Sequence, residues 1–166
     1  MRSLRYAGAL LLWAGLGAMS LPPAPAHGST ASGGGTYAID GITTEFQFSQ
    51  SHVQCKIGHA VMPGGVNFQM LMFSTGIDSV SIVDNTVTIT GTMVSIVNLR
   101  SPNGASTTFN EMVPFVAVGV DNGTPGAGVD TFSLTVVYAS GGGQAGLFGT
   151  PATFAGTLTT GNIVVR

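Results

Sequence analysis

Apolar and polar side chains alternate along most of this 166-residue chain after residue 35. In residues 131–136, TFSLTV, every second side chain is apolar and the others carry hydroxyl groups. Residues 77–83 and 86–90 show the same period of two, which is typical of strands with one buried face. Residues 66–73 carry apolar side chains on both faces and therefore predict a strand at the centre of a sheet.

This pattern predicts an all-β protein. β-branched residues dominate after residue 35, glycine recurs too often for long helices, and no segment keeps a helical period. The predicted strands are 36–40, 43–49, 52–61, 66–73, 77–83, 86–90, 92–99, 107–120, 130–139, 152–158 and 162–166. Short strands at close spacing indicate an antiparallel β-sandwich or a small barrel. We expect a sandwich, Ig-like or jelly-roll-like, because two packed sheets bury one face of each strand.

The N-terminus has the pattern of an export signal. Arg2 and Arg5 precede an uncharged apolar run at 7–19, and the prolines that follow break any helix before the small residues Ala24 and Ala26. The run is shorter than the roughly 20 residues that span a bilayer, so we expect a cleaved signal peptide at 1–26. Cleavage after residue 20 and an uncleaved membrane anchor are the alternatives.

The expected domain organisation follows from that signal. Residues 27–35, HGSTASGGG, have almost no apolar side chain and are interpreted as a flexible leader. A single domain then covers 36–166. Its expected location is secreted, extracellular or periplasmic, with no membrane span once the signal is removed.

Charge excludes two classes of partner. Without the signal peptide the chain keeps three cations against seven carboxylates, a net charge of −4. A nucleic-acid binder or a peripheral protein of anionic membranes needs clustered Lys and Arg. Charged residues make up 7% of the chain and apolar ones 44%, so hydroxyl and amide groups cover the surface. A protein or glycan at the cell surface is the expected partner.

The single cysteine, Cys55, rules out a disulfide within the chain. We interpret it as a small buried hydrophobic residue, with an intermolecular disulfide as the alternative.

The glycine-rich loop at 120–130, VDNGTPGAGVD, is a candidate cation site. Asp121, Asn122 and Asp130 supply the hard oxygen ligands that Ca²⁺ prefers. Turn chemistry explains the same residues, because Asp and Asn side chains bond nearby backbone groups and Asp130 stands where the next strand begins. A structural turn is the favoured reading, with calcium as the alternative.

Catalytic patterns are weak. Cleavage after Ala26 would make His27 the N-terminal residue, which could hold copper together with His52 or His59, but the flexible leader gives this site no anchor. Glu45 and Glu111 are more simply solvated strand residues than a glycosidase pair. The chain has no G-x-S-x-G motif, phosphate loop or zinc pattern. We therefore expect a protein that is not an enzyme.

Pro114 lies inside the predicted strand 107–120. Proline cannot donate to a sheet ladder, so this strand is expected at an edge or at a bulge. An exposed edge can accept a strand from a partner or from a second copy, which makes self-association a further hypothesis.

Three segments resemble one bacterial family. They are STGIDSVSIVDNTVTITGT (74–92), VGVDNGTPGAGVDTFSLTV (118–136) and GTLTTGNIVV (156–165). Together they resemble the secreted β-domain that often follows choice-of-anchor domains, the post-COAP family, over about residues 66–166. This chain has an extra residue, Val129, before the aspartate, and residues 36–65 show no clear correspondence.

The resemblance implies a β-fold and a cell-surface location but no reaction. Together with the missing catalytic pattern, it predicts a non-catalytic secreted module with a structural, adhesive or accessory binding role. The alternative is a secreted metal-binding protein or enzyme that uses calcium at the 121–130 loop or copper at His27.

Overall fold

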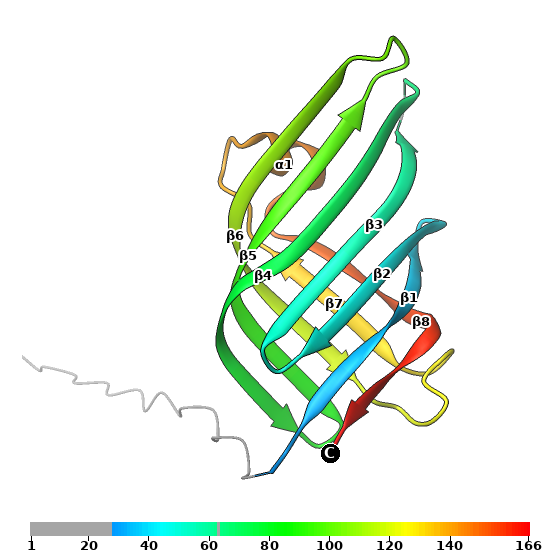
Figure 1. Cartoon of the computed structure of the whole chain (residues 1–166), viewed down its shortest axis with the longest axis vertical. Helices are drawn as coiled ribbons and strands as arrows, with labels where there is room; N and C mark the ends of the chain where they lie inside the picture. The colour runs from blue at the N-terminus through cyan, green and yellow to red at the C-terminus, as the bar shows by residue number, and fades with distance from the viewer. Residues whose placement is uncertain (1–27, 63) are drawn as a thin grey trace, which may run out of the picture.

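The computed structural model describes residues 28–62 and 64–166. Eight strands and one short helix make up the fold: β1 (Ala31–Ile39), β2 (Ile42–Ser49), β3 (His52–Met62), β4 (Val66–Val83), β5 (Thr86–Arg100), β6 (Ser106–Val120), β7 (Thr131–Val136), α1 (Gly143–Phe148) and β8 (Ala152–Val165). Each strand pairs antiparallel with the next, and β8 pairs with β1, so the sheet closes into a barrel (Figure 1).

The expected β-sandwich, Ig-like or jelly-roll-like, is therefore wrong, although the chain is nearly all β. Alternation buries one face of each strand in a sandwich and in a barrel alike, so the pattern does not separate the two. The deciding contact joins the two ends of the sheet: Ala31 pairs with Val165 and Gly35 with Gly161.

The leader assigned to 27–35 also needs correction, because residues 31–35 form the first half of β1. Glycine is required there by close packing. A Cβ on Gly35 would overlap the carbonyl oxygen of Thr160 on β8, and a Cβ on Gly33 would lie 2.7 Å from the Phe48 ring. The glycine run thus allows two backbones to approach at the barrel seam. The signal peptide at 1–26 and His27 lie outside the described residues.

Several predicted strands merge into longer ones. Segments 66–73 and 77–83 form β4, and 86–90 and 92–99 form β5. The register of β4 against β5 shifts between Ser74 and Gly76 and again between Ile77 and Ser79. These irregularities bend the strand without ending it.

The barrel interior is filled with apolar side chains. The rings of Phe46 and Phe132 stack with their centroids 4.1 Å apart, and Phe48 stacks on the same group. Tyr37 and Cys55 are fully buried beside them. No helix within residues 28–62 and 64–166 has the length and apolar character needed to cross a membrane.

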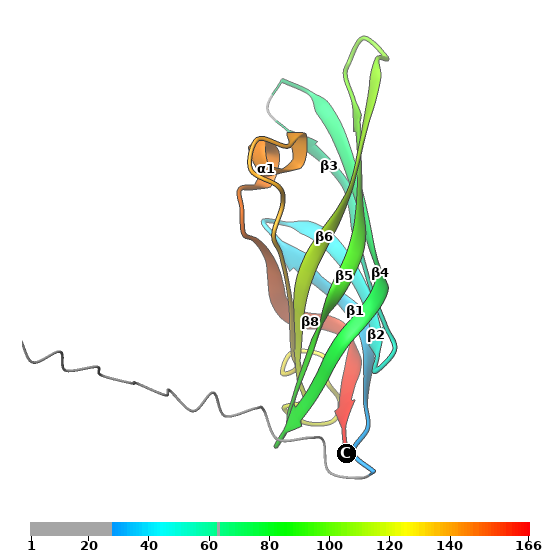
Figure 2. The ribbon, with the colours of Figure 1, turned by 90° about the vertical axis from the view of Figure 1, so that its left-hand side faces the viewer.

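Helix α1 was not predicted, since its first half belongs to the glycine-rich sequence SGGGQAG (140–146), which is typical of a turn. It lies against the inner side of the upper barrel (Figure 2), where the ring of Phe148 is 6.1 Å from that of Phe68. The buried Gln144 holds the helix in place. Its Oε1 accepts a hydrogen bond from Ser95 Oγ (2.6 Å), and its Nε2 donates to the Ser95 carbonyl (2.9 Å).

Strands β3 to β6 extend beyond their neighbours at one end of the barrel (Figure 1). Strand β7 pairs with β6 only over 115–120, so residues 106–113 of β6 have a ladder partner on one side, β5. Pro114 stands at this boundary, and its carbonyl accepts a hydrogen bond from Val137 N–H (3.1 Å). The predicted edge thus exists on 106–113, and self-association through it stays a prediction.

Candidate functional site

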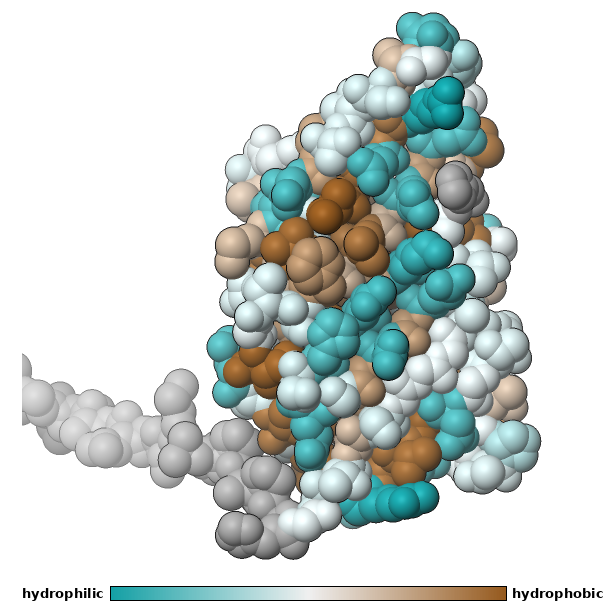
Figure 3. Space-filling view, viewed as in Figure 1, coloured by the Kyte–Doolittle hydropathy of each residue, from teal (hydrophilic) through white to brown (hydrophobic). Residues whose placement is uncertain are grey.

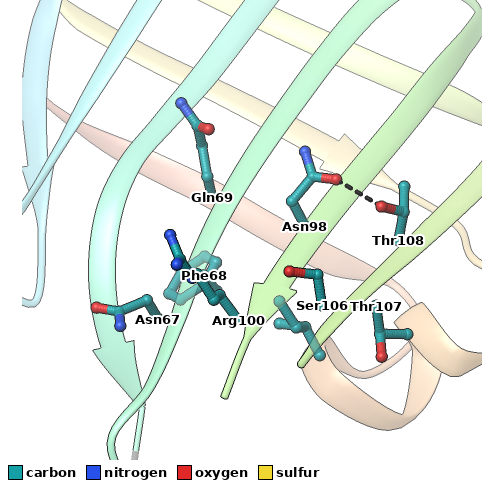
Figure 4. Close-up of a pocket in the computed structure, with 9 residues that line it drawn as sticks. Asn67, Phe68, Gln69, Asn98, Arg100, Ser106, Thr107 and Thr108 are labelled. Carbon is teal, nitrogen blue, oxygen red and sulfur yellow. Dashed lines mark hydrogen bonds between the residues drawn. The ribbon is translucent and has the colours of Figure 1, made fainter. Parts of the chain in front are cut away.

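A groove of about 380 Å³ lies on the projecting ends of β4, β5 and β6. We call it the tip groove, and Figure 4 shows its lining: Asn67, Phe68, Gln69, Asn98, Leu99, Arg100, Ser106, Thr107 and Thr108. Residues 67–69 come from a stretch well before 98–100, and the turn at 101–105 joins 98–100 to 106–108. The three stretches are neighbours in the sheet. Strand pairing alone therefore assembles the groove.

Register places six polar side chains of the groove in two rows across the outer face. Gln69 on β4, Asn98 on β5 and Thr108 on β6 form one row, in which Thr108 Oγ1 donates to Asn98 Oδ1 (2.8 Å; Figure 4). The other row is Asn67, Arg100 and Ser106.

The residues between these rows point the other way. Phe68 is 8% exposed and Leu99 packs against the core, so alternation sends their polar neighbours outward.

Arg100 gives the tip groove a positive charge. The Lys56 ammonium pairs with Glu45 (3.5 Å), but no carboxylate within 28–62 and 64–166 pairs with the exposed Arg100. A guanidinium group presents a rigid fork of donors that fits carboxylates, and the surrounding amides and hydroxyls both donate and accept. The groove can therefore bind a ligand rich in hydroxyl groups that also carries an acidic group.

The other surface hollows described here do not combine an unneutralised charge with several polar side chains. One is lined by β1, β2 and β8 and another by β6, β7 and β8, and neither lining includes a charged residue. A third contains Lys56 and Glu45, whose charges neutralise each other. We therefore regard the tip groove as the candidate site.

An apolar patch adjoins the tip groove. Pairing places Leu71 beside Ile96, and Phe73 beside Val94, on the same outward face of β4 and β5. Figure 3 shows apolar residues gathered on this face, with hydrophilic residues frequent around the projecting strand ends.

The 121–130 loop uses its carboxylates to hold backbone amides. The fully buried Asp130 accepts hydrogen bonds from Asn122 N–H and Ile163 N–H, both at 2.8 Å. Asp121 accepts from Gly123 N–H (3.2 Å) and Val165 N–H (3.1 Å). The loop is thereby tied to β8, and each of the four carboxylate oxygens already has a donor.

Asn122 is held as well, because its Nδ2 donates to the Val129 carbonyl (2.8 Å) and its Oδ1 accepts from Asn85 (3.3 Å). One oxygen in this region has no hydrogen-bond partner, the buried Oδ1 of Asn162 near Asp130. Ca²⁺ takes about six to eight oxygen ligands, and five of the six side-chain oxygens named here already accept a hydrogen bond within the protein. The calcium site at Asp121, Asn122 and Asp130 stays a prediction.

The other candidate residues are dispersed. Glu45 on β2 and Glu111 on β6 lie on strands that are not neighbours, and Glu111 Oε1 accepts a hydrogen bond from Ala139 N–H (2.6 Å). His52 Nδ1 is 3.4 Å from Ser74 Oγ, and His59 lies further along β3. No group of three or more His, Cys, Asp or Glu side chains gathers within 28–62 and 64–166.

Cys55 is buried in the core, which confirms the prediction of a small hydrophobic residue. Burial raises the pKa of its thiol to about 12, an effect that a weak hydrogen bond with Tyr37 opposes. Because the thiolate is the reactive form, we expect Cys55 in the folded protein to resist a maleimide reagent at pH 8 and to react at once in denaturant. Rapid labelling of the native protein would contradict this burial.

No protein-family model, curated protein or solved structure matches this chain. The candidate site therefore rests on the geometry of this chain alone.

The tip groove was not predicted from the sequence. Its signal is present only in part, as polar residues spaced two apart near the ends of three segments: Asn67 and Gln69, Asn98 and Arg100, Ser106 and Thr108. Such pairs occur in many solvent-facing strands, and only the register shows that these three share one surface.

Proposed function

We propose that this protein is a non-catalytic secreted binding module whose tip groove holds an acidic glycan. The observation that carries the proposal is the guanidinium of Arg100, which pairs with no carboxylate in the described part of the chain and is set among five outward amide and hydroxyl side chains on three adjacent strands. A carboxylated sugar fits this chemistry. Its acid group pairs with Arg100, and its hydroxyl groups exchange hydrogen bonds with Asn67, Gln69 and Asn98.

The apolar patch supports a longer ligand. The carbon–hydrogen faces of sugar rings can pack on Phe73, Leu71 and Ile96, which lie next to the polar rows. A saccharide of several units would then cross from the apolar patch into the tip groove.

The proposed role agrees with the predicted export of the chain. A single acid group on the ligand needs one cation, Arg100, and not the clustered Lys and Arg that a nucleic acid or an anionic membrane requires. The resemblance to the post-COAP family and the secreted or periplasmic location stay predictions. A binding function of this kind needs no catalytic residue, and we infer that the protein is not an enzyme. A calcium-dependent role for the 121–130 loop is less favoured, since its carboxylates already bind backbone amides.

Replacing Arg100 tests the proposal. We expect Arg100→Gln to weaken binding to uronic-acid oligosaccharides by about ten- to a hundredfold, the effect of one lost charge-assisted hydrogen-bonded pair. Calorimetric titration with acidic and matched neutral oligosaccharides measures it, and the affinity of the wild type for the acidic series should fall with added salt.

Arg166→Gln is the matched control, because it removes the same charge from the exposed C-terminal residue, whose backbone pairs with Thr30. Equal binding by the two variants, or no preference of the wild type for acidic over neutral oligosaccharides, would show that the tip groove is not the site.

A further inference from the structure

The turn that joins β5 to β6 contains an exposed Asn-Gly pair, Asn103–Gly104. Its backbone bonds are confined to the turn: Gly104 N–H donates to the Ser101 carbonyl (2.9 Å), and Ser101 N–H donates to the Ala105 carbonyl (2.9 Å). Asn103 Oδ1 accepts from Ala105 N–H (3.1 Å), while its side-chain nitrogen has no partner within the described residues. The turn is held by a few exposed bonds at the end of a projecting hairpin.

We propose that Asn103 is a site of self-modification by deamidation. The Gly104 nitrogen loses its proton and attacks the side-chain carbonyl carbon of Asn103. A new C–N bond closes a five-membered imide, and the amide nitrogen leaves as ammonia. Water then opens the ring at either carbonyl, giving aspartate or isoaspartate. The balance is one water consumed and one ammonia released, with no oxidant and no enzyme.

Glycine makes this attack accessible. It carries no Cβ to obstruct the approach of its nitrogen, and Gly104 takes a φ of +87°, where other residues are strained. A Cβ on Gly104 would meet nothing within 4 Å, so the space around the turn is open. The hydrogen bond from Gly104 N–H must break before cyclisation, and an exposed turn at a hairpin tip opens at little cost in free energy.

The chain provides its own comparison in a second Asn-Gly pair, Asn122–Gly123. Both ends of the Asn122 side chain are bonded, its backbone N–H is held by Asp130, and Gly123 N–H is held by Asp121. Cyclisation there requires release of a loop that is tied to β8. The two Asn-Gly pairs therefore have the same sequence, but their different hydrogen bonding predicts different rates of deamidation.

Deamidation at Asn103 changes the charge beside the candidate site. The new carboxylate arises three residues from Arg100 and three from Ser106, on the turn that connects these two groove residues. It competes for the guanidinium and repels an anionic ligand. This consequence rests on the proposed function and would make ageing of the protein a one-way loss of acidic-glycan binding.

Peptide mapping tests the modification. The folded protein is held at pH 8 and 37 °C, and cleavage after Arg100 and Glu111 then releases Asn103 and Asn122 in separate peptides. We expect Asn103 to convert at least about ten times faster than Asn122. In urea the two rates should converge. Equal rates in the folded protein, or an intact Asn103, would overturn the proposal.

Binding tests the consequence separately. We expect Asn103→Asp to weaken acidic-oligosaccharide binding, and Asn103→Gln, which keeps the amide and cyclises poorly, to retain it. Equal affinities of these two variants for a ligand that the wild type binds would overturn the effect on the site. If no acidic glycan binds the wild type, the proposed function fails, and the peptide map still decides the modification.

Discussion

Replacing Asp130 by alanine is expected to lower the free energy of unfolding by roughly 3–5 kcal/mol. The carboxylate is fully buried and accepts backbone hydrogen bonds from Asn122 and Ile163, which belong to different parts of the chain. Hydrogen bonds to a charged group contribute about 1.5–3 kcal/mol each, and alanine would leave both amides without this acceptor. Urea unfolding followed by circular dichroism measures the change.

Asp78→Ala is the control for this experiment, because Asp78 is exposed on β4 and should change stability by less than about 0.5 kcal/mol. Asp130→Asn should give an intermediate loss of stability. Its side-chain oxygen can still accept one of the two hydrogen bonds, but its NH₂ group would face the second backbone N–H, and two donors cannot bond each other. Similar stabilities of the Asp130→Ala and Asp78→Ala proteins would contradict the bonded loop. Titrating Ca²⁺ into the wild type in the same assay tests the calcium alternative, which requires a rise in stability.

The 121–130 loop shows which contacts could be predicted from the sequence and which could not. Local turn chemistry predicts that Asp130, at the junction of the loop and the next strand, can accept hydrogen bonds from loop amides. Its bond to Asn122 N–H agrees, although the strand itself begins at Thr131. Its second bond, to Ile163, joins residues 33 positions apart. That contact depends on where β8 lies, and nothing local specifies it.

The tip groove could not be predicted from the sequence either, because it also depends on contacts between strands. The alternation in 66–73 and 92–99 predicts strands, but which outward residues become neighbours depends on register. Two shifts between β4 and β5 alter that register within a single pair of strands. A change of one residue would move Arg100 to the other face of the sheet.

The error in fold class has a similar origin. The interior alternates as expected, with Phe132, Leu134 and Val136 all buried. A sandwich and a barrel differ in whether the first and last strands meet, and the first strand lies partly in a glycine run that composition assigns to a flexible leader. The glycines are better explained by close approach of β1 to β8 than by flexibility.

Gly35→Ala is therefore expected to destabilise the barrel by about 3 kcal/mol or more, at the upper end of the cost of overpacking. The added methyl group would overlap the Thr160 carbonyl, a backbone atom of β8 that cannot turn aside as a side chain could. Because Gly35 is in a strand and does not have a positive φ, the cost comes from crowding at the seam and not from backbone strain.

The neighbouring Gly34→Ala is the matched control, since the nearest atom to its Cβ is the Phe46 carbonyl oxygen at 3.4 Å, an ordinary contact. Its stability should stay within about 1 kcal/mol of the wild type. Thermal unfolding of the two variants side by side distinguishes a closed barrel from an open sheet with a free leader. In the open arrangement residue 35 touches nothing, so equal melting temperatures for the two variants would mean that β1 and β8 do not meet.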